Sequence, residues 1–275
     1  MEINKELKKK EISDIEKITD PLTEKFMATE VVDEEYSVMP KKEDVKERDM
    51  DGTKISRPTR VVTGIPGLDD KLQGGFIPNS AILISGEAGS GKTIFCTQFI
   101  WNALCMGENG LYVTLQQSPN EIKNDVLPFG KDFHSAEKRG QARIIYVDPS
   151  WDLKKIVNQI IKNVRDISAK RLAIDSITLI GEQSKDVRKS LTYLVRELKE
   201  MGVTTLITSE IPEGSKNISK FGIEEFIVDG VIVLRCGADV VGDKPRSLEI
   251  KKMRRTKHDL HYHPFEITDR GIVVK

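Results

Sequence analysis

Residues 86–93, Gly-Glu-Ala-Gly-Ser-Gly-Lys-Thr, constrain the fold of this chain more than any other stretch. They fit the pattern G-x-x-x-x-G-K-[ST], and the apolar run 81–85 before them is typical of a buried strand. Residues 93–104 after them have the length and composition of a helix. A strand, a glycine-rich loop and a helix in this order predict a phosphate-binding loop, where backbone N–H groups and a helix N-terminus surround phosphate oxygens.

This loop contains several groups that can bind phosphate or its Mg²⁺ ion. Its glycines allow backbone N–H groups to turn toward bound oxygens. Lys92 brings an ammonium to the terminal phosphates of a nucleotide, and Thr93 brings a hydroxyl to Mg²⁺. The candidate nucleotide-binding residues are the eight positions Gly86, Glu87, Ala88, Gly89, Ser90, Gly91, Lys92 and Thr93.

The overall charge and the cysteines exclude some function classes. The 275 residues include 43 Lys and Arg and 43 Asp and Glu, so the formal net charge is zero and no global attraction to nucleic acid is expected. The three cysteines form no C-x-x-C pair and are too scattered for a disulfide framework. No signal peptide and no apolar stretch of membrane-spanning length is visible, so we expect a cytoplasmic protein.

The chain divides near residue 57 into an N-terminal extension and a nucleotide-binding domain, 58–275. Residues 1–57 are dense in charge and poor in aromatics, so we expect them to be largely disordered or loosely helical. Five apolar residues could nonetheless form one face of a short helix: Ile3, Leu7, Ile12, Ile15 and Ile18. The extension is then either a solvated tail with a transient helix, which composition favours, or a helix that docks on a partner or on the domain.

From residue 57 onward, strands and helices alternate. The pattern predicts strands at 81–85, 110–115, 142–147, 171–175 and 203–208, and helices at 93–104, from about 119, 153–167 and 185–201. Such alternation implies an α/β fold with a mainly parallel sheet covered by helices on both faces. Past residue 215 we expect no further helix, and strands at 230–236, 246–253, 264–268 and 271–274 that extend the sheet in antiparallel fashion.

A second nucleotide motif is the apolar strand that ends in Asp175. In a parallel sheet its carboxyl end lies beside the phosphate loop. We therefore expect Asp175 to hold Mg²⁺ together with Thr93, directly or through water.

Further motifs carry a family resemblance. They are residues 63–70 (Thr-Gly-Ile-Pro-Gly-Leu-Asp-Asp), 74–75 (Gly-Gly), 175–178 (Asp-Ser-Ile-Thr), 224–226 (Glu-Glu-Phe), 229–231 (Asp-Gly-Val) and 252–258 (Lys-Met-Arg-Arg-Thr-Lys-His). From about Arg60 to Lys275 the chain resembles the KaiC-like branch of the RecA superfamily, which also contains RadA and its paralogues. The resemblance implies a single RecA-like P-loop NTPase domain that binds ATP with Mg²⁺.

The resemblance also implies a homo-oligomeric ring, often hexameric, with ATP between neighbouring subunits. Lys252 and Arg254 match the basic residues that such a subunit offers to its neighbour's terminal phosphate, and Thr256 and His258 match residues near the nucleotide. A guanidinium delivered in this way stabilises charge on a transferring phosphoryl group. The family usually has Gly where this chain has Arg255. A solvated basic edge strand is the alternative interpretation of 251–257.

The catalytic positions depart from the family. The strand after the first helix normally ends in two glutamates, and the matching residues here are Gln116 and Gln117. An amide accepts no proton at neutral pH, although glutamine can still orient an attacking water. We therefore expect nucleotide binding with slow or absent turnover. Glu210 is either a polar sensor near the phosphate or a loop carboxylate.

Three other features of the sequence carry weaker functional signals. Glu225 and Phe226 occupy the place of the phosphorylated Ser and Thr of the KaiC clock protein, so autophosphorylation there is not expected. His258, His261 and His263 cluster, but the further ligands of a closed zinc site are missing. The loop 214–220 carries two lysines that could meet DNA phosphates, although a surface loop is the simpler interpretation.

Two functions follow as hypotheses. The first is a KaiC-like regulatory or scaffold protein in which ATP acts chiefly as an assembly ligand and an unidentified regulatory protein reads the assembled state. The second is a RadA-paralogue-like, DNA-dependent ATPase of recombination or repair, which would bind single-stranded DNA. A phosphotransferase is a third and weaker possibility, because Glu225 and Phe226 disfavour it.

Overall fold

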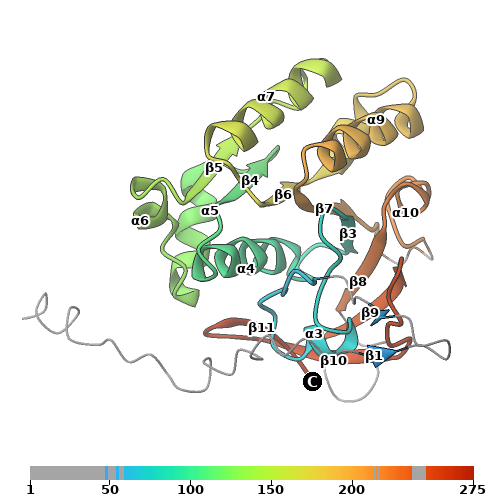
Figure 1. Ribbon diagram of the computed structural model, residues 1–275. Helices are drawn as coiled ribbons and strands as arrows, with labels where there is room; N and C mark the ends of the chain where they lie inside the picture. The colour runs from blue at the N-terminus through green and yellow to red at the C-terminus, as the bar shows by residue number, and fades with distance from the viewer. Residues whose placement is uncertain (1–46, 49–53, 56–58, 214, 216, 237–245) are drawn as a thin grey trace, which may run out of the picture. The chain divides into compact units, whose positions relative to one another are not determined.

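The computed structural model describes residues 47–48, 54–55, 59–213, 215, 217–236 and 246–275 (Figure 1). The chain falls into two units, Met1–Arg57 and Pro58–Lys275. In the first unit, β1 (Glu47–Arg48) pairs antiparallel with β2 (Lys54–Ile55). These four residues are paired strands, although we expect residues 1–57 to be largely disordered or loosely helical; the other residues of this extension lie outside the described part of the chain.

A single large sheet organises the second unit. Its order is β11-β10-β9-β8-β3-β7-β6-β4-β5. The strands are β3 (Ala81–Gly86), β4 (Gly110–Thr114), β5 (Ala142–Tyr146), β6 (Arg171–Asp175), β7 (Thr204–Glu210), β8 (Gly230–Cys236), β9 (Arg246–Met253), β10 (Tyr262–Thr268) and β11 (Gly271–Val274). All pairs from β8 through β3 to β5 are parallel, whereas β9, β10 and β11 add antiparallel strands. The predicted fold class is confirmed.

Both faces of this sheet are buried, which explains the continuous apolar runs of the central strands. Successive residues of β3 point to opposite faces. Ile82 and Ile84 pack with Phe95 and Phe99 in one core cluster, and Leu83 belongs to a second cluster. In Figure 1 the helix after β3 lies on one side of the sheet, and two long helices lie on the other.

The helices connect and cover the parallel strands. They are α3 (Leu68–Lys71), α4 (Lys92–Cys105), α5 (Pro119–Val126), α6 (Phe133–Lys138), α7 (Leu153–Asp166), α8 (Ile177–Glu182), α9 (Val187–Glu200) and α10 (Glu224–Ile227), with a 3₁₀ turn at Leu127–Phe129. Ser118 and Glu121 form a capping box at the start of α5, and Asp152 and Asp186 cap α7 and α9. Among the described helices, none is long and apolar enough to cross a membrane.

One expectation about the C-terminal part was wrong. Residues 224–227 form the short helix α10, although we expected no helix past residue 215. β7 and β8 both lie parallel to β3, so the chain must cross back over the sheet between them. α10 forms part of this crossover, and four residues are too few to show a helical period in the sequence.

The order of the strands determines where chemistry can occur. β3, β4, β6 and β7 all run in the same direction, so their carboxyl ends meet at one edge. Ligands of open α/β sheets bind at this edge. The phosphate loop follows β3 there, and Asp175 ends β6 at the same edge.

Candidate nucleotide site

The phosphate loop leaves β3 at Gly86 and enters α4 at Lys92. Gly89 and Gly91 have φ angles of 75° and 98°, a left-handed conformation that favours glycine. Gly86 is required for a different reason. A Cβ there would lie 2.5 Å from the carbonyl oxygen of Leu234. The conformation and the close approach of β8 therefore both account for the glycines of the loop.

Lys92 is held across this loop. Its Nζ donates hydrogen bonds to the backbone oxygens of Gly86 and Glu87, each at 2.8 Å. Burial lowers the pKa of Lys92, and the nearby carboxylates of Asp175 and Glu210 oppose that shift. A phosphate beside the ammonium would oppose it further, because an opposite charge favours the protonated form.

Asp175 is the centre of a cluster of oxygen ligands. Its Oδ2 accepts hydrogen bonds from Thr93 Oγ1 at 2.8 Å and from the hydroxyl of Tyr112 at 2.6 Å. Its Oδ1 accepts one from Thr208 Oγ1 at 2.6 Å. Carboxylate and hydroxyl oxygens are the ligands that Mg²⁺ prefers, so the donors fit this metal. The structure brings Thr93 and Asp175 together as expected, and metal binding by them stays a prediction.

Tyr112 and Thr208 were not found from the sequence. Tyr112 is fully buried on β4, and burial together with the charge of Asp175 raises the pKa of its hydroxyl well above the usual value. It therefore stays a neutral donor to the carboxylate. The sequence gives little indication of this role, because a tyrosine in an apolar strand is usually a core residue. The register that places it beside β6 is set only in the folded sheet.

The glutamine pair lies beside this cluster. Gln116 and Gln117 follow β4, whose last residue, Thr114, lies opposite Asp175 in the sheet register. Thr114 Oγ1 accepts hydrogen bonds from the backbone N–H groups of Gln116 and Gln117 at 3.3 Å and 3.0 Å. It also donates one to the Gln117 carbonyl at 2.9 Å. The backbone of the pair is thus fixed at the edge of the sheet where the phosphate loop lies.

Glu210 also lies at this edge. It is the last residue of β7, opposite Gly86, and its side chain is exposed. Its backbone N–H donates to Thr178 Oγ1 at 3.2 Å, and the next residue, Ile211, donates to the Gly86 carbonyl at 3.1 Å. This contact ties the segment after β7 directly to the phosphate loop.

The basic residues of β9 lie elsewhere in the same chain. Lys252 is opposite Val231 of β8, whereas Gly86 is opposite Leu234, three residues further along that strand. At about 3.3 Å per residue, this is about 10 Å along the strand, and two strand spacings add about 10 Å across the sheet. The structure therefore does not bring Lys252 to the phosphate loop of its own subunit. Arg254 follows Lys252 and lies further from the loop.

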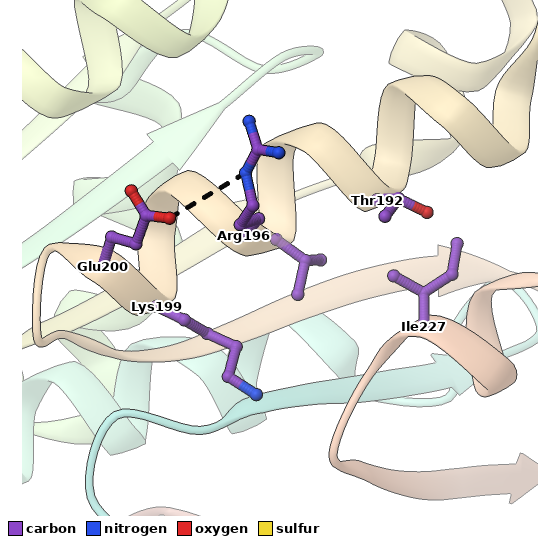
Figure 2. Close-up of a pocket in the computed structure, with 6 residues that line it drawn as sticks. Thr192, Arg196, Lys199, Glu200 and Ile227 are labelled. Carbon is purple, nitrogen blue, oxygen red and sulfur yellow. Dashed lines mark ion pairs between the residues drawn. The ribbon is translucent and has the colours of Figure 1, made fainter.

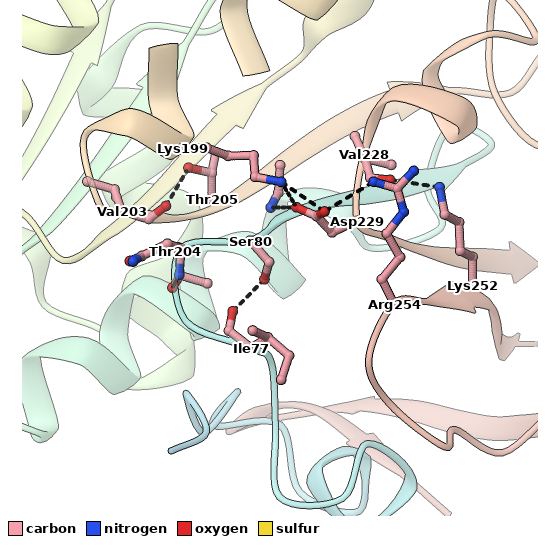
Figure 3. A network of polar contacts seen from close by, with 12 residues as sticks. Ile77, Ser80, Lys199, Val203, Thr204, Thr205, Val228, Asp229, Lys252 and Arg254 are labelled. Carbon is pink, nitrogen blue, oxygen red and sulfur yellow. Dashed lines mark hydrogen bonds and ion pairs between the residues drawn. The ribbon is translucent and has the colours of Figure 1, made fainter. Parts of the chain in front are cut away.

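Near the start of β8 these cations form a polar network (Figure 3). Lys252 Nζ donates to the backbone oxygens of Glu225 at 2.8 Å and Val228 at 2.7 Å. Burial, followed by the charge of Arg254, lowers the pKa of Lys252. Arg254 Nη1 lies 3.4 Å from Asp229 Oδ1, and about half of its side chain is exposed. Of the two cations Lys252 and Arg254, Arg254 is therefore the more accessible from outside the chain.

Thr256 and His258 also lie near the end of β9, away from their own phosphate loop. Thr256 Oγ1 accepts a hydrogen bond from Arg60 Nη1 at 2.7 Å. His258 Nδ1 lies 3.2 Å from the Asp259 carbonyl. Neither contact involves the loop, so the structure does not bring Thr256 or His258 to the phosphate loop of the same chain, and their place near a nucleotide stays a prediction.

The remaining candidates are weaker. The described residues contain no group of three or more His, Cys, Asp or Glu that could hold a metal ion. His261 Nδ1 instead contacts Asp259 Oδ1 at 2.5 Å. Of the two lysines in the loop 214–220, Lys216 lies outside the described residues, and Lys220 Nζ pairs with Glu182 Oε1 at 3.4 Å.

A hollow of about 410 Å³ lies between α9 and α10, away from the phosphate loop (Figure 2). It is lined by Thr192, Val195, Arg196, Lys199, Glu200 and Ile227. Arg196 and Glu200 pair across one turn of α9 at 3.9 Å. None of the predicted site residues lines the hollow, so it is not part of the candidate nucleotide site.

Comparison with known proteins identifies the family. The family model described as "ATPase: KaiC" matches residues 61–275. The UPF0273 protein of Thermotoga maritima is 38% identical over 232 residues, which cover 78% of this chain and 95% of that protein. The circadian clock oscillator protein KaiC of Prochlorococcus marinus is 34% identical over 228 residues, which cover 78% of this chain and 45% of that protein.

A solved structure agrees with these matches. The crystal structure of a KaiC-like protein from the archaeon Pyrococcus horikoshii is similar to this chain with a TM-score of 0.73 and 39% sequence identity. The match covers 80% of this chain and all of that one. The intact phosphate loop, the Asp175 cluster and these similarities together show that the chain belongs to the KaiC ATPase family, and that residues 61–275 form one KaiC-like domain of the RecA-like superfamily.

Proposed function

We propose that this protein binds Mg-ATP at the interface between subunits, and that ATP supports ring assembly and the binding of a regulatory partner while being hydrolysed slowly. One observation carries the proposal. A complete phosphate loop and the cations Lys252 and Arg254 lie apart in the sheet of one subunit.

This separation favours assembly on the nucleotide. ATP on the loop of one subunit carries terminal phosphates that its own Lys252 and Arg254 cannot contact. A neighbouring copy can supply these cations, which stabilise phosphate charge. Because the nucleotide then contacts two subunits, its binding energy also stabilises the assembled state.

The proposed slow turnover follows from Gln116 and Gln117. Magnesium held by Thr93 and Asp175 would neutralise phosphate charge and orient the nucleotide. The glutamine amides can orient a water molecule but cannot take its proton, so general-base assistance is absent at this point. A step that loses general-base catalysis is slowed by about 10²–10⁴-fold.

The second candidate is a RadA-paralogue-like, DNA-dependent ATPase that acts on single-stranded DNA. The RecA-like fold favours it, and so does the position of Lys220 in the segment after β7. Its weakness is that Lys220 already pairs with Glu182, and that the formal net charge of the chain is zero.

One experiment separates these functions. Oligomer mass and ATP turnover are measured together for wild type and for the double variant Gln116→Glu with Gln117→Glu, with and without single-stranded DNA. We expect ATP-dependent assembly of both proteins and rapid turnover only in the glutamate variant. Fast ATP hydrolysis by wild type would contradict the predicted slow turnover. Stimulation of wild-type ATP turnover by DNA would favour the second function.

A further inference from the structure

Glu224 is a buried carboxylate that no step above uses. It lies at the start of α10 and is 1% exposed. Its oxygens accept hydrogen bonds from Ser209 Oγ at 3.0 Å, Ser219 Oγ at 2.8 Å, and the backbone N–H groups of Phe221 and Ile223 at 3.2 Å. These donors are neutral. A buried carboxylate held by neutral groups is costly, which favours a specific role over a contribution to stability alone.

On one side, Glu224 is connected to the phosphate loop. Ser209 lies on β7 directly opposite Ser85, the residue before the loop. Two residues after Ser209, the N–H of Ile211 donates to the Gly86 carbonyl at 3.1 Å. Lys92 Nζ binds the same carbonyl at 2.8 Å. A shift of the loop on nucleotide binding therefore acts on the strand end that Glu224 holds.

On the other side, Glu224 is connected to Lys252. α10 extends from Glu224 to Ile227, and Lys252 Nζ binds the carbonyls of Glu225 and Val228 at 2.8 Å and 2.7 Å. The next residue, Asp229, accepts a backbone hydrogen bond from Arg254 at 2.9 Å. Figure 3 shows Lys252 and Arg254 around Val228 and Asp229. The position of α10 therefore determines how both cations are presented.

We propose that Glu224 is a positioning residue that fixes α10 between the phosphate loop and Lys252 of the same subunit. Nucleotide bound at the phosphate loop would then align Lys252 and Arg254, which the subunit offers to its neighbour. The inference rests on the proposed function, in which Lys252 acts on a neighbour's nucleotide. Glu224 itself touches no reacting atom. Its effect is to make successive sites of an assembly cooperate.

Glu224→Gln tests this chemistry with almost no change of shape. The amide nitrogen replaces an oxygen that accepts hydrogen bonds. Hydroxyl groups of Ser209 and Ser219 can reverse their direction. The backbone N–H of Phe221 cannot, and because it bonds both oxygens of Glu224 it faces the new NH2 group in either orientation of the amide. We therefore expect α10 to shift and Lys252 to lose its paired carbonyls, while the phosphate loop keeps its own contacts.

The measurements use the full chain. The dissociation constant of a fluorescent ATP analogue is measured on dilute protein, and the ATP dependence of assembly is measured by light scattering. For Glu224→Gln, we expect a dissociation constant within about threefold of wild type. We expect an assembly midpoint raised about tenfold with a Hill coefficient close to 1, as couplings of this class are worth roughly 5–150-fold.

Glu213→Gln is the matched control, because Glu213 is an exposed glutamate in the same connection. Ser209→Ala removes one donor to Glu224 without changing charge, and it decides the question if Glu224→Gln does not fold. A raised midpoint for Ser209→Ala supports the inference. Assembly of Glu224→Gln or of a folded Ser209→Ala variant with the midpoint and Hill coefficient of Glu213→Gln overturns it.

Lys252→Ala separates this inference from the proposed function. If Glu224 acts through Lys252, adding Glu224→Gln to Lys252→Ala changes the assembly midpoint no further. Fully additive effects overturn the role of Glu224 and leave the proposed function intact. If Lys252→Ala alone assembles like wild type, the inference fails, whereas the proposed function fails only if Lys252→Ala with Arg254→Ala also assembles like wild type.

Discussion

At the scale of single residues, Arg255 adopts a backbone conformation that is unfavourable for a residue with a side chain. Arg255 has a φ of 58°, a left-handed conformation that costs a side-chain-bearing residue about 1–2 kcal/mol. It follows Arg254 and precedes Thr256, and its carbonyl accepts a hydrogen bond from Arg60 Nη2 at 3.4 Å. A glycine at this position would adopt the same conformation without that cost.

Arg255→Gly is therefore expected to stabilise the protein. Relief of the left-handed conformation outweighs the greater backbone freedom of glycine in the unfolded chain, which leaves a net gain of about 0.5–1 kcal/mol. Urea denaturation measures it. Lys257→Gly is the control, because Lys257 has no positive φ, and it should destabilise. A loss of stability for Arg255→Gly would show that the arginine side chain makes a compensating contact.

The phosphate loop supports a second prediction at this scale. Lys92→Ala removes the ammonium that spans the loop, so ATP affinity should fall at least about tenfold, since a hydrogen bond to a charged group is worth roughly 1.5–3 kcal/mol. Isothermal titration calorimetry with Mg-ATP measures the change. Lys189→Ala, an exposed lysine of α9, should leave affinity unchanged. Equal affinities for both variants would contradict the role of Lys92.

Part of the site could be predicted residue by residue. Thr93 and Asp175 could, because the loop pattern and an apolar strand ending in a carboxylate each have a local signature. Tyr112, Thr208 and Glu224 could not, because their roles depend on which strands are neighbours and on their register. A buried hydroxyl or carboxylate has no sequence signature until its partner is known.

At the scale of elements, short helices connect the parts of the site. α8 begins directly after Asp175 and Ser176, and it packs against the segment that precedes α10. A Cβ on Gly181 of α8 would lie 2.3 Å from the ring of Phe221. The sequence predicted α7 and α9 because they show a clear helical period, and α4 because a helix follows a phosphate loop. α8 and α10 are too short to show a period.

Gly181→Ala tests this packing. The gain in helix propensity, about 1 kcal/mol, is opposed by overpacking against Phe221, which typically costs about 1–3 kcal/mol, so we expect net destabilisation. Chemical denaturation measures the change. In a Phe221→Ala background the ring is absent, and Gly181→Ala should become neutral or stabilising. Destabilisation of equal size in both backgrounds would show that Phe221 is not the cause.

At the scale of the whole domain, 58–275, the two ends of the parallel strands carry different sets of residues. The carboxyl edge of the parallel strands holds the phosphate loop and the Asp175 cluster. The opposite edge presents Lys252 and Arg254 around Asp229. The sequence predicted the mixed sheet, but the separation of the two sets follows from the register of β3, β8 and β9. No local pattern contains that information.

Asp229 joins several elements at this second edge. Its carboxylate lies 2.8 Å from Lys199 Nζ of α9 and accepts the backbone N–H of Ala81 at 3.1 Å. Burial raises the pKa of Asp229, but the hydrogen bonds and the charges of Lys199 and Arg254 outweigh burial and lower it from 3.8. Because the pKa of Asp229 is lower in the folded than in the unfolded protein, its carboxylate stabilises the fold at pH values above the unfolded-state pKa. This stabilisation is lost as pH falls through the folded-state pKa.

Asp229→Asn should therefore destabilise the protein at pH 7. The difference in stability between wild type and this variant should shrink as pH falls from about 4 downward, because protonation removes the same charge from wild type. Thermal unfolding from pH 7 to pH 3 measures the difference. A difference that stays constant over this range would contradict the role of the Asp229 charge.

The most direct test of the account is complementation between two defective subunits. Lys92→Ala lacks the loop ammonium but keeps its cations, whereas Lys252→Ala with Arg254→Ala keeps the loop but lacks the cations. Sedimentation velocity with Mg-ATP should find each variant alone unassembled. A mixture should form complexes, because the loop of one variant meets the cations of the other. Failure of the mixture to associate, or assembly of the Lys252→Ala, Arg254→Ala variant alone, would contradict a nucleotide site shared between subunits.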